Sequence, residues 1–458
     1  MTTIEGIPFA RSLKDRRVVV VGLGRTGMAT TRLLVGLGAQ VSVTDAKPAS
    51  ELAAAVAELP AGVECAFGGH PLKLVRRAHL VVTSPGVAWD APPLAAAREA
   101  GVEVISEMEL AWRLLPTPWV AVTGSNGKST TTTLIGQMAH AAGLRAVVGG
   151  NIGNPVAGLV EEAVGADYLV AEISTFQLEG VQAFRPSIAV ALNVTEDHLD
   201  RHGSFAAYAD LKRRIYAAQG VCDCVVLNDG DPLLLGWGRE GRSRRFAFRA
   251  EGPVDRGAYR YGQEVRWRDN GREEALYELA ALSPDAQRNV DNVLAATCTA
   301  RLMGVEPEAM VEVLGGFRGL EHRLEEVATI DGVTFINDSK GTNVGAVMNA
   351  LKSMDRPVIL IAGGQDKGGD FSPLCELVAA RVRGVVLIGE AAERLGRLFN
   401  CYTALERADS LQAAVRAAFE RARPGEVVLL SPACASFDMF QDFEERGLCF
   451  KEAVRALQ

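Results

Sequence analysis

The chain has 458 residues, of which 48% are hydrophobic, and its 48 basic and 56 acidic residues give a formal net charge of −8. This length fits about three ordinary domains, and the acidic balance argues against a protein that binds nucleic acid. No apolar run approaches the roughly 18 residues that a membrane-spanning helix needs, and residues 1–17 lack a secretory pattern. The eight scattered cysteines predict buried, reduced thiols and a cytoplasmic location rather than a disulfide scaffold.

The first predicted domain, residues 1–115, begins with a nucleotide-binding pattern. The buried strand Val18 to Val21 leads into Gly22-x-Gly24-x-x-Gly27 and a helix-like run, and a second strand ends at Asp45. In this layout the glycines let a phosphate approach the backbone, and the acid accepts a hydrogen bond from a ribose hydroxyl. NAD would be the default ligand, but the domain is too short for a six-stranded dinucleotide fold, so one diphosphate-bearing ligand fits better. A tight strand–helix turn without a ligand is the alternative.

A second loop of this domain lies at the end of a predicted strand. Ser84-Pro85-Gly86 follows the apolar run His79 to Thr83, and a further strand is expected from Val102 to Ile105. Ligands dock at the carboxyl ends of strands in open α/β sheets, so Ser84 is a candidate contact. Pro116 and Pro118 mark the end of the domain.

The stretch from Trp119 to Thr130 combines an apolar strand with a loop that ends in Gly-Lys-Ser, and a helix-like run continues to Ala141. This is the order of a phosphate-binding loop, in which backbone N–H groups and a helix N-terminus face the anion. Lys128 would reach the outer phosphates, and the hydroxyl of Ser129 would hold Mg²⁺. The general motif has Gly where this chain has Val122, so an ordinary strand–helix turn is the alternative.

Two more predicted strands of the middle domain, residues 116–319, end in polar residues. Tyr168 to Ala171 is followed by Glu172, and the run Ser187 to Val194 is followed by an acidic cluster that includes His198. If the three strands are parallel neighbours, their carboxyl ends share one edge of the sheet, and Glu172 and His198 lie near the phosphate loop. Oxygen ligands beside phosphates suit Mg²⁺. Helix capping by the acidic cluster is the alternative.

Two weaker patterns complete the middle domain. The glycine-rich loop Gly149 to Asn154 could bring backbone N–H groups or the amide of Asn151 to a ligand. The segment Arg239 to Leu279 alternates charged with aromatic or apolar residues between turn signals, which predicts an antiparallel flap. Its arginines are interleaved with many acids, so it does not have the composition of a nucleic-acid patch.

The last predicted domain, residues 320–458, is a third α/β unit with a mainly parallel sheet. Strands are expected at residues 334–336, 358–362, 384–388 and 427–430, with helices between them. Polar loops follow three of these strands, and two of the loops carry Lys340 and Lys367. Each lysine alone is typical of a solvated surface, but two on one sheet edge favour capture of a phosphate or carboxylate.

Together these motifs resemble the Mur ligases, the ATP-dependent amide-forming enzymes of peptidoglycan synthesis. The family is marked by Thr123-Gly-Ser-Asn-Gly-Lys-Ser-Thr130, Asn193-Val-Thr-Glu-Asp-His-Leu-Asp200, and His322-Arg323 followed by Asn337-Asp-Ser-Lys340. The N-terminal glycine pattern, Glu172-x-Ser174-x-Phe176-Gln-Leu-Glu179 and Ser431-Pro-Ala-Cys-Ala-Ser-Phe-Asp438 are similar to the members that use D-glutamate. The resemblance covers nearly the whole chain. It implies an α/β fold with an N-terminal Rossmann-like domain, a central P-loop ATPase-like domain with a mostly parallel sheet, and a mobile, C-terminal Rossmann-like domain.

The resemblance also implies ligand contacts. ATP would contact Gly124, Ser125, Asn126, Gly127, Lys128, Ser129, Thr130, Asn289, Asn292, Arg323, Asp338 and Lys340. The UDP-containing substrate would contact Gly24, Arg25, Thr26, Asp45, Lys47, Ser84, Asn151, Ser174, Gln177 and His198. D-Glutamate would contact Thr342, Lys367, Ser436 and Phe443.

The catalytic residues implied by the resemblance are Lys128, His198 and Lys212. One Mg²⁺ would be held by Ser129 and Glu172, and a second by His198 and Lys212. The resemblance implies that Lys212 carries CO₂ as a carbamate, which turns a cation into an anionic oxygen ligand. The residues themselves show only a lysine on a probable helix.

The implied reaction joins D-glutamate to UDP-N-acetylmuramoyl-L-alanine through an acyl phosphate, in a cytoplasmic monomer that serves peptidoglycan synthesis. One alternative is a sibling ligase that adds L-alanine, diaminopimelate or lysine, or that adds glutamate to a folate. Others are a nicotinamide-dependent oxidoreductase and a non-enzymatic ATP switch that docks a protein. An oxidoreductase leaves the phosphate loop unexplained, and the motif at Ser431 favours D-glutamate.

Overall fold

The computed structural model describes residues 4–237 and 241–457. Its backbone divides into two compact units. The first comprises Met1–Val194, Ala209–Ser283 and Asn289–Gly316, and the second comprises Thr195–Tyr208, Pro284–Arg288 and Phe317–Gln458. Within the described residues the strands form three sheets, two in the first unit and one in the second, so the predicted three-part α/β fold is confirmed. The boundaries predicted for the three domains stay predictions.

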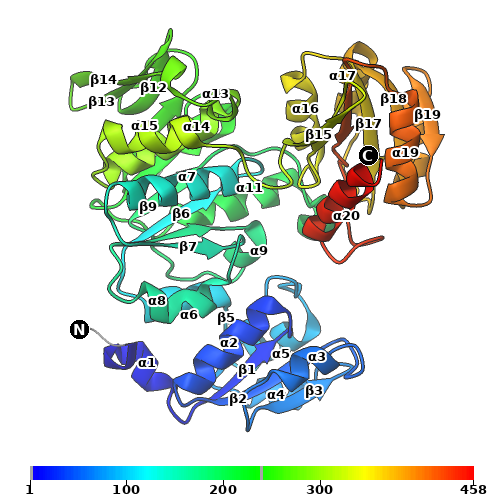
Figure 1. Ribbon diagram of the computed structural model, residues 1–458. Helices are drawn as coiled ribbons and strands as arrows, with labels where there is room; N and C mark the ends of the chain where they lie inside the picture. The colour runs from blue at the N-terminus through cyan, green and yellow to red at the C-terminus, as the bar shows by residue number, and fades with distance from the viewer. Residues whose placement is uncertain (1–3, 238–240, 458) are drawn as a thin grey trace. The chain divides into compact units, whose positions relative to one another are not determined.

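The N-terminal sheet has the strand order β3-β2-β1-β4-β5 (Figure 1). Its strands are β1 (Arg17–Val21), β2 (Gln40–Asp45), β3 (Glu64–Phe67), β4 (Leu80–Thr83) and β5 (Glu103–Ser106). The helices of this part are η1 (Ile4–Gly6), α1 (Pro8–Leu13), α2 (Arg25–Gly36), α3 (Ala53–Ala57), α4 (Leu72–Arg76), α5 (Pro92–Glu99) and α6 (Glu107–Leu114). The described pairings are all parallel, and β1 lies at the centre because Val18 to Val21 are buried on both faces.

The central sheet has the order β14-β13-β12-β11-β10-β9-β6-β8-β7. Its strands are β6 (Trp119–Thr123), β7 (Ala146–Gly150), β8 (Tyr168–Glu172), β9 (Ile188–Ala191), β10 (Cys224–Asn228), β11 (Arg244–Arg249), β12 (Gly257–Tyr261), β13 (Glu264–Asp269) and β14 (Arg272–Glu278). As predicted, β6 pairs in parallel with both β8 and β9, so their carboxyl ends share one edge.

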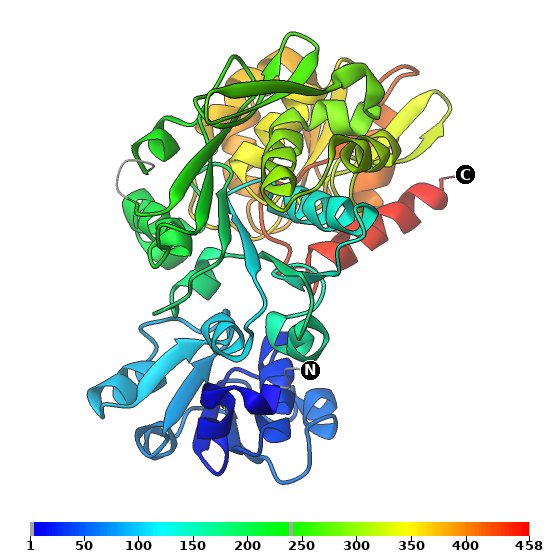
Figure 2. The ribbon, with the colours of Figure 1, turned by 90° about the vertical axis from the view of Figure 1, so that its left-hand side faces the viewer.

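The helices of the central part of the chain include α7 (Lys128–Ala141), which ends at the predicted residue. The others are η2 (Val156–Leu159), α8 (Val160–Ala163), α9 (Thr175–Leu178), α10 (Leu199–His202), α11 (Phe205–Arg213), η3 (Arg214–Tyr216), α12 (Pro232–Trp237), η4 (Leu279–Ala281), α13 (Pro284–Arg288), α14 (Val290–Leu302) and α15 (Pro307–Gly316). Helix α7 packs on β6, β7 and β8 and against α14 (Figures 1 and 2).

The segment predicted as a separate antiparallel flap differs in the structure. Its first predicted residue, Arg239, lies outside the described residues. The strands β11 and β12 extend the central sheet in parallel, and only β12, β13 and β14 pair in antiparallel order. The alternating pattern predicted strands correctly but could not give their direction, because parallel and antiparallel strands alternate alike. Glycine at position 257, at the start of β12, allows a close approach to β11. A Cβ on Gly257 would lie 1.8 Å from the carbonyl oxygen of Ala247.

The third sheet has the order β15-β16-β20-β17-β18-β19 and is parallel apart from the pair β15–β16. Its strands are β15 (Glu325–Ile330), β16 (Val333–Asn337), β17 (Val358–Gly363), β18 (Val382–Ile388), β19 (Ala404–Arg407) and β20 (Val427–Leu430). Its helices are α16 (Val344–Ser353), η5 (Ser372–Leu374), α17 (Cys375–Arg381), α18 (Ala392–Phe399), α19 (Leu411–Arg421) and α20 (Phe443–Arg455). One face packs on α16 to α18 and the other on α19 and α20.

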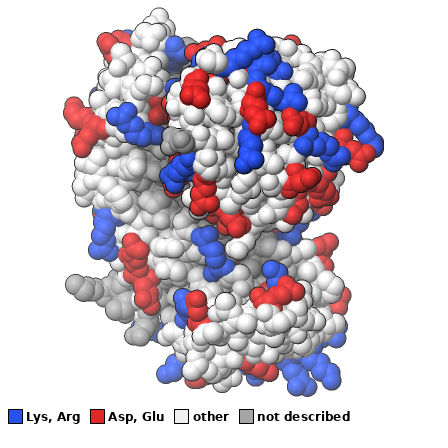
Figure 3. All heavy atoms as spheres, turned by 45° about the vertical axis from the view of Figure 1, so that its right-hand side comes forward, with Lys and Arg blue, Asp and Glu red and all other residues white. Residues whose placement is uncertain are grey.

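The state of the cysteines agrees in part with the prediction. The eight cysteines are free, as predicted, but Cys65, Cys222 and Cys401 are exposed rather than buried. On the face shown in Figure 3, basic and acidic side chains are interspersed. Among the helices of the described residues, none is long and apolar enough to cross a membrane.

Candidate active site

A cavity of about 650 Å³ opens at the carboxyl edge of the N-terminal sheet. Eight residues predicted to bind the UDP-containing substrate line it, namely Gly24, Arg25, Thr26, Asp45, Lys47, Ser84, Asn151 and Gln177. They come from the turn after β1 and the start of α2, the end of β2 and the loop after it, the loop after β4, the loop after β7, and helix α9. The structure therefore gathers most of this predicted group in one place.

The glycine loop after β1 is held in shape by its neighbours. A Cβ on Gly27 would lie 1.9 Å from the carbonyl oxygen of Gly22, so only glycine allows α2 to start this close to β1. The hydroxyl of Ser84 donates to the same carbonyl at 2.9 Å. The two carboxylate oxygens of Asp45 accept hydrogen bonds from the backbone N–H groups of Leu23 at 2.7 Å and Lys47 at 2.9 Å. Asp45 thus shapes the loop in addition to facing the cavity.

Two side chains in this region have roles that the sequence did not predict. His70 lines the cavity, and its Nδ1 lies 3.0 Å from the hydroxyl of Thr44. Burial lowers the pKa of His70, while the charge of Asp45 opposes that shift. Ser174 does not line the cavity; its hydroxyl accepts from the N–H of Gln177 and caps α9. A lone histidine in a loop gives no sequence signal, whereas a Ser followed three residues later by Gln is typical of a helix cap.

The phosphate loop connects β6 to α7 with glycine at two strained positions. Gly127 has φ +84°, and a Cβ there would lie 2.1 Å from Oδ1 of Asn292. Asn292 therefore packs directly on the loop, and its amide nitrogen lies 3.3 Å from Oδ1 of Asn289. This places the two asparagines predicted to contact ATP, Asn289 and Asn292, beside the predicted phosphate site.

Asn193, at the end of β9, secures the phosphate loop. The backbone N–H groups of Ser125 and Asn126 donate to the backbone oxygen and to Oδ1 of Asn193, at 3.0 and 2.8 Å. The Asn193 amide donates back to the carbonyl oxygen of Asn126 at 3.1 Å. These bonds orient the loop, so Asn193 supports the predicted phosphate site. The family motif contains this residue, but sequence reasoning did not single it out.

Two lysines converge on the loop. Lys128 Nζ donates to the carbonyl oxygens of Gly124 and Ser125, each at 2.9 Å. Lys212 is 2% exposed, and its Nζ donates to the same Gly124 oxygen at 2.8 Å. Two ammonium groups on one carbonyl repel each other, and a bound anion or loss of one positive charge would relieve that repulsion.

Glu172 is the last residue of β8, and only one of its two carboxylate oxygens accepts a hydrogen bond from the described residues. Its Oε1 accepts from the side-chain amide of Asn151 at 2.8 Å, whereas Oε2 is buried and has no partner in the part of the chain that the structure describes. Ser129, at the start of α7, is also buried. A carboxylate oxygen without a hydrogen bond, beside a phosphate loop, fits a hard divalent cation that takes one or two protein ligands and completes its shell with phosphates and water. No group of three or more His, Cys, Asp or Glu side chains that could hold a metal ion is found among the described residues.

The second unit contains His198 and the residues predicted to bind D-glutamate. Lys367 Nζ lies 3.2 Å from Oδ1 of Asp197, and the amide of Asn343 donates to Oδ2 at 3.0 Å. Burial opposes ionisation of Asp197, but the charges of Lys367 and His198 outweigh it and lower the pKa of this carboxyl. Thr342 and Lys367 line a small cavity here of about 30 Å³, which is room for one water.

The remaining predicted residues of the second unit lie near the ends of β16 and β20. Asp338 accepts from the Ser431 hydroxyl at 2.7 Å, and burial raises the pKa of Asp338 to about 6 against the effect of that bond. Lys340 Nζ lies 4.9 Å from the centre of the Phe443 ring, a cation–π contact. Ser436 is buried, and Nε of Arg323 is buried without a hydrogen-bond partner in the described part of the chain.

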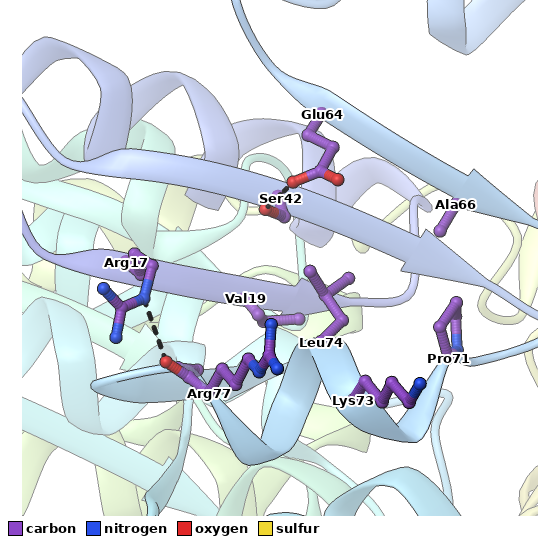
Figure 4. A pocket seen from close by; sticks show the side chains of 10 residues that line it. Arg17, Val19, Ser42, Glu64, Ala66, Pro71, Lys73, Leu74 and Arg77 are labelled. Atoms are coloured by element: carbon purple, nitrogen blue, oxygen red, sulfur yellow. Dashed lines mark hydrogen bonds between the residues drawn. The ribbon is translucent and has the colours of Figure 1, made fainter.

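A second cavity on the N-terminal sheet, of about 630 Å³, lies beside α4 and the faces of β1, β2 and β3 (Figure 4). Arg17 donates to the carbonyl oxygen of Arg77 at 3.0 Å, and Ser42 donates to Glu64 at 3.0 Å. None of its described lining residues is a predicted site residue. The cavity at the carboxyl edge therefore remains the candidate for nucleotide binding.

Comparison with known proteins extends these observations. Residues 122–300 match the model of the Mur ligase middle domain, residues 16–106 that of the Mur ligase MurD-like N-terminal domain, and residues 322–434 that of the Mur ligase glutamate ligase domain. A curated relative from Geotalea uraniireducens, UDP-N-acetylmuramoylalanine–D-glutamate ligase, is 44% identical over 97% of this chain and 98% of its own length.

Two solved structures share the fold. A pseudomurein peptide ligase type C from Methanothermus fervidus is 18% identical and covers 97% of this chain and 100% of its own, with a TM-score of 0.60. The MurF ligase from Thermotoga maritima, in complex with ADP, is 16% identical and covers 100% of both chains, also with a TM-score of 0.60. At these identities the likeness concerns the fold alone.

Proposed function

The chain belongs to the Mur ligase family, as its motifs predict, and on that premise we propose that it joins D-glutamate to UDP-N-acetylmuramoyl-L-alanine at the expense of ATP. The observation that carries this proposal is the phosphate loop, with Lys128 on its carbonyls and the buried oxygen of Glu172 beside it. The name of the relative that matches nearly the whole chain supports the choice of substrates. The enzyme would act in the cytoplasm, as a monomer, in peptidoglycan synthesis.

The proposed chemistry has two steps. The alanyl carboxylate of the uridine nucleotide attacks the γ-phosphorus of ATP, the bond to the bridging oxygen breaks, and ADP leaves. The amine of D-glutamate then attacks the acyl carbon, loses a proton, and expels phosphate to leave an amide. Ser129 and Glu172 would hold Mg²⁺, which would supply neutralising charge for the phosphates. Lys128 adds a fixed cation, and the N–H groups at the start of α7 face the phosphates.

The two anionic substrates would bind to different parts of the chain. The cavity at the N-terminal sheet, with Arg25 and Lys47 in its lining, would hold the uridine diphosphate. In the second unit Lys367 and Thr342 would receive a carboxylate of D-glutamate, in the place where Lys367 now pairs with Asp197. Holding both reactants in one geometry supplies much of the rate enhancement in such a reaction.

The first test measures phosphate release from ATP with UDP-N-acetylmuramoyl-L-alanine and a panel of D- and L-amino acids. Release that needs both partners and is fastest with D-glutamate is the expected result. If another amino acid is fastest, the chain is a sibling ligase. Release that ignores the uridine nucleotide contradicts the assignment of the first cavity, and ATP binding without release identifies a switch rather than an enzyme.

We also infer that Lys212 is carbamylated in the active enzyme, with its neutral amine adding to CO₂ and losing one proton. The shared Gly124 carbonyl supports this, because a carbamate removes one of two neighbouring positive charges and adds an oxygen ligand. Carbon-13 NMR in labelled bicarbonate is expected to show a carbamate signal in the native enzyme that Lys212→Gln lacks. The variant is expected to lose about a hundredfold in turnover, the scale of one electrostatic contact in a transition state. Full activity of the native enzyme in CO₂-free buffer, with no such signal, contradicts the inference.

A further inference from the structure

Helix α6 leads from the N-terminal sheet to the strand before the phosphate loop, and it carries two buried carboxylates, those of Glu107 and Glu109. We propose that Glu107 is a positioning residue that fixes the loop of residues 150–157 at the cavity for the uridine nucleotide. This inference rests on the proposed function, because that function assigns the cavity to the UDP-containing substrate. Glu107 itself does not line the cavity.

The Glu107 side chain reaches the start of η2. It is 1% exposed, and its Oε1 accepts a hydrogen bond from the backbone N–H of Ala157 at 2.6 Å. Its Oε2 has no partner among the residues that the structure describes. Burial raises the pKa of Glu107 to about 7, even though the N–H groups of Ala157 and Val156 favour the charged form. Burying a carboxyl costs more free energy than burying an apolar side chain. The hydrogen bond to the N–H of Ala157 is what this carboxyl provides in return.

Besides backbone bonds such as that from the Asn151 N–H to the Glu172 carbonyl oxygen, at 2.9 Å, three hydrogen bonds of side chains hold the loop of residues 150–157. They join the Asn151 amide to Glu172, the Arg25 guanidinium to the carbonyl oxygen of Gly153, and the N–H of Ala157 to Glu107. Arg25 and Asn151 also line the cavity, so changing either would remove a ligand contact as well as a loop contact. Glu107 and Glu172 lie outside the lining, but Glu172 is the proposed ligand of Mg²⁺, so Glu107 is the side chain that can be changed without touching a proposed ligand contact.

The position of Asn151 shows why this loop matters for the reaction. Its side chain lies in the cavity lining and also donates to Glu172, the carboxylate that fits Mg²⁺. A shift of the loop would therefore move a substrate contact and the partner of a metal ligand together. A displacement of about 1 Å in such a group can cost a hundredfold in rate.

Glu109 provides a matched control on the same helix. It is 0% exposed and accepts hydrogen bonds from the N–H groups of Gln182, Ala183 and Phe184 at 3.0 to 3.2 Å. It also pairs with Arg113 at 2.8 Å. The residues that Glu109 holds do not line the cavity. Glu107 and Glu109 are thus both buried glutamates of α6, but Glu107 bonds to Ala157 and Glu109 bonds to residues 182–184.

The experiment compares Glu107→Met, Glu107→Gln and Glu109→Met in the full-length enzyme. Glu107→Met removes the acceptor, whereas Glu107→Gln keeps an oxygen for Ala157. We expect Glu107→Met to raise KM for UDP-N-acetylmuramoyl-L-alanine about tenfold, the effect of losing one charged hydrogen bond, with a smaller rise in KM for ATP. Glu107→Gln is expected to restore KM to nearly the native value. Glu109→Met is expected to lower stability without this selective change in KM.

Hydrogen exchange gives a readout that does not depend on activity. The amide of Ala157 is expected to exchange slowly in the native enzyme and faster in Glu107→Met, with no change in Glu109→Met. Fast exchange of this amide in the native enzyme overturns the proposal, even if Glu107→Met does not fold. So does a folded Glu107→Met with native KM. If phosphate release by the native enzyme does not depend on the uridine nucleotide while the Ala157 amide exchanges slowly, the proposed function is wrong and the loop contact stands.

Discussion

Replacing Lys128 with alanine is expected to lower ATP-dependent turnover by about a thousandfold or more, the scale of losing a positioned cation at a transferring phosphoryl group. In the structure Lys128 Nζ rests on the carbonyl oxygens of Gly124 and Ser125, within the loop that faces the phosphates. When ATP binds, this ammonium would stabilise the negative charge that develops on the departing oxygen. The measurement is phosphate release with saturating substrates.

Folding of this variant needs its own measurement. Lys128 is half-buried at the first position of α7, and alanine is a strong helix former, so the helix itself is expected to persist. Lys73→Ala, at an exposed lysine of α4, is the matched control and is expected to keep native turnover. A Lys128→Ala variant with native circular dichroism and near-native ADP release would rule out the catalytic role of this lysine.

The fold around the phosphate loop was predictable because its signals are local. An apolar run, a glycine-bearing turn and a helix-forming stretch follow one another, and α7 ends at the predicted residue, Ala141. The strands β8 and β9 were also predictable, since buried parallel strands read as continuous apolar runs, whereas their place beside β6 was a condition of the prediction that the structure meets. Polar residues directly after such runs, such as Glu172, then meet at one sheet edge without any knowledge of tertiary contacts.

Other features depend on contacts between distant residues and could not be predicted from local patterns. Asn193 secures the phosphate loop across 67 positions of sequence, and neither its type nor its neighbours distinguish it from a turn residue. The strands β15 and β19 have exposed and half-buried residues only, so they lack the apolar run that identified β16 and β17. Ser174 is the opposite case. The resemblance assigned it to the substrate, but its hydroxyl caps α9, and this local bond is sufficient reason for a serine at this position.

Arg446 is a further residue that only the structure reveals, and its replacement carries the second large expected effect. It is 1% exposed in α20. Its guanidinium donates to the hydroxyl and carbonyl oxygens of Ser339, at 3.0 and 2.7 Å, and to the carbonyl oxygens of Cys434 and Ala435, at 3.2 to 3.3 Å. Burial lowers the pKa of Arg446 to about 10, so the group stays charged at neutral pH.

These bonds join the two loops predicted to bind substrates in the second unit. Ser339 lies between Asp338 and Lys340, and Ala435 directly precedes Ser436. Arg446→Met would remove the donors that the described residues offer to the Ser339 and Cys434 carbonyl oxygens, whereas that of Ala435 keeps the N–H of Gln365 at 2.9 Å. We expect the free energy of unfolding to fall by about 3–5 kcal/mol. Because the loops would then move independently, KM for D-glutamate is expected to rise at least tenfold more than KM for the uridine nucleotide. Urea unfolding and steady-state kinetics measure the two effects.

Two further variants separate the bonds of Arg446 from its charge and its helix. Arg446→Lys keeps the positive charge, but a single ammonium cannot reproduce the planar fork that serves both loops, so an intermediate loss is expected. Arg455→Met changes an exposed arginine of the same helix and is expected to leave stability and KM unchanged. If Arg446→Lys retained native stability and native KM for D-glutamate, charge alone would suffice, and the guanidinium would not be what joins the loops. A stable Arg446→Met with native kinetics would show that backbone bonds such as Ala433 N to Gly341 O, at 2.9 Å, hold the loops together unaided.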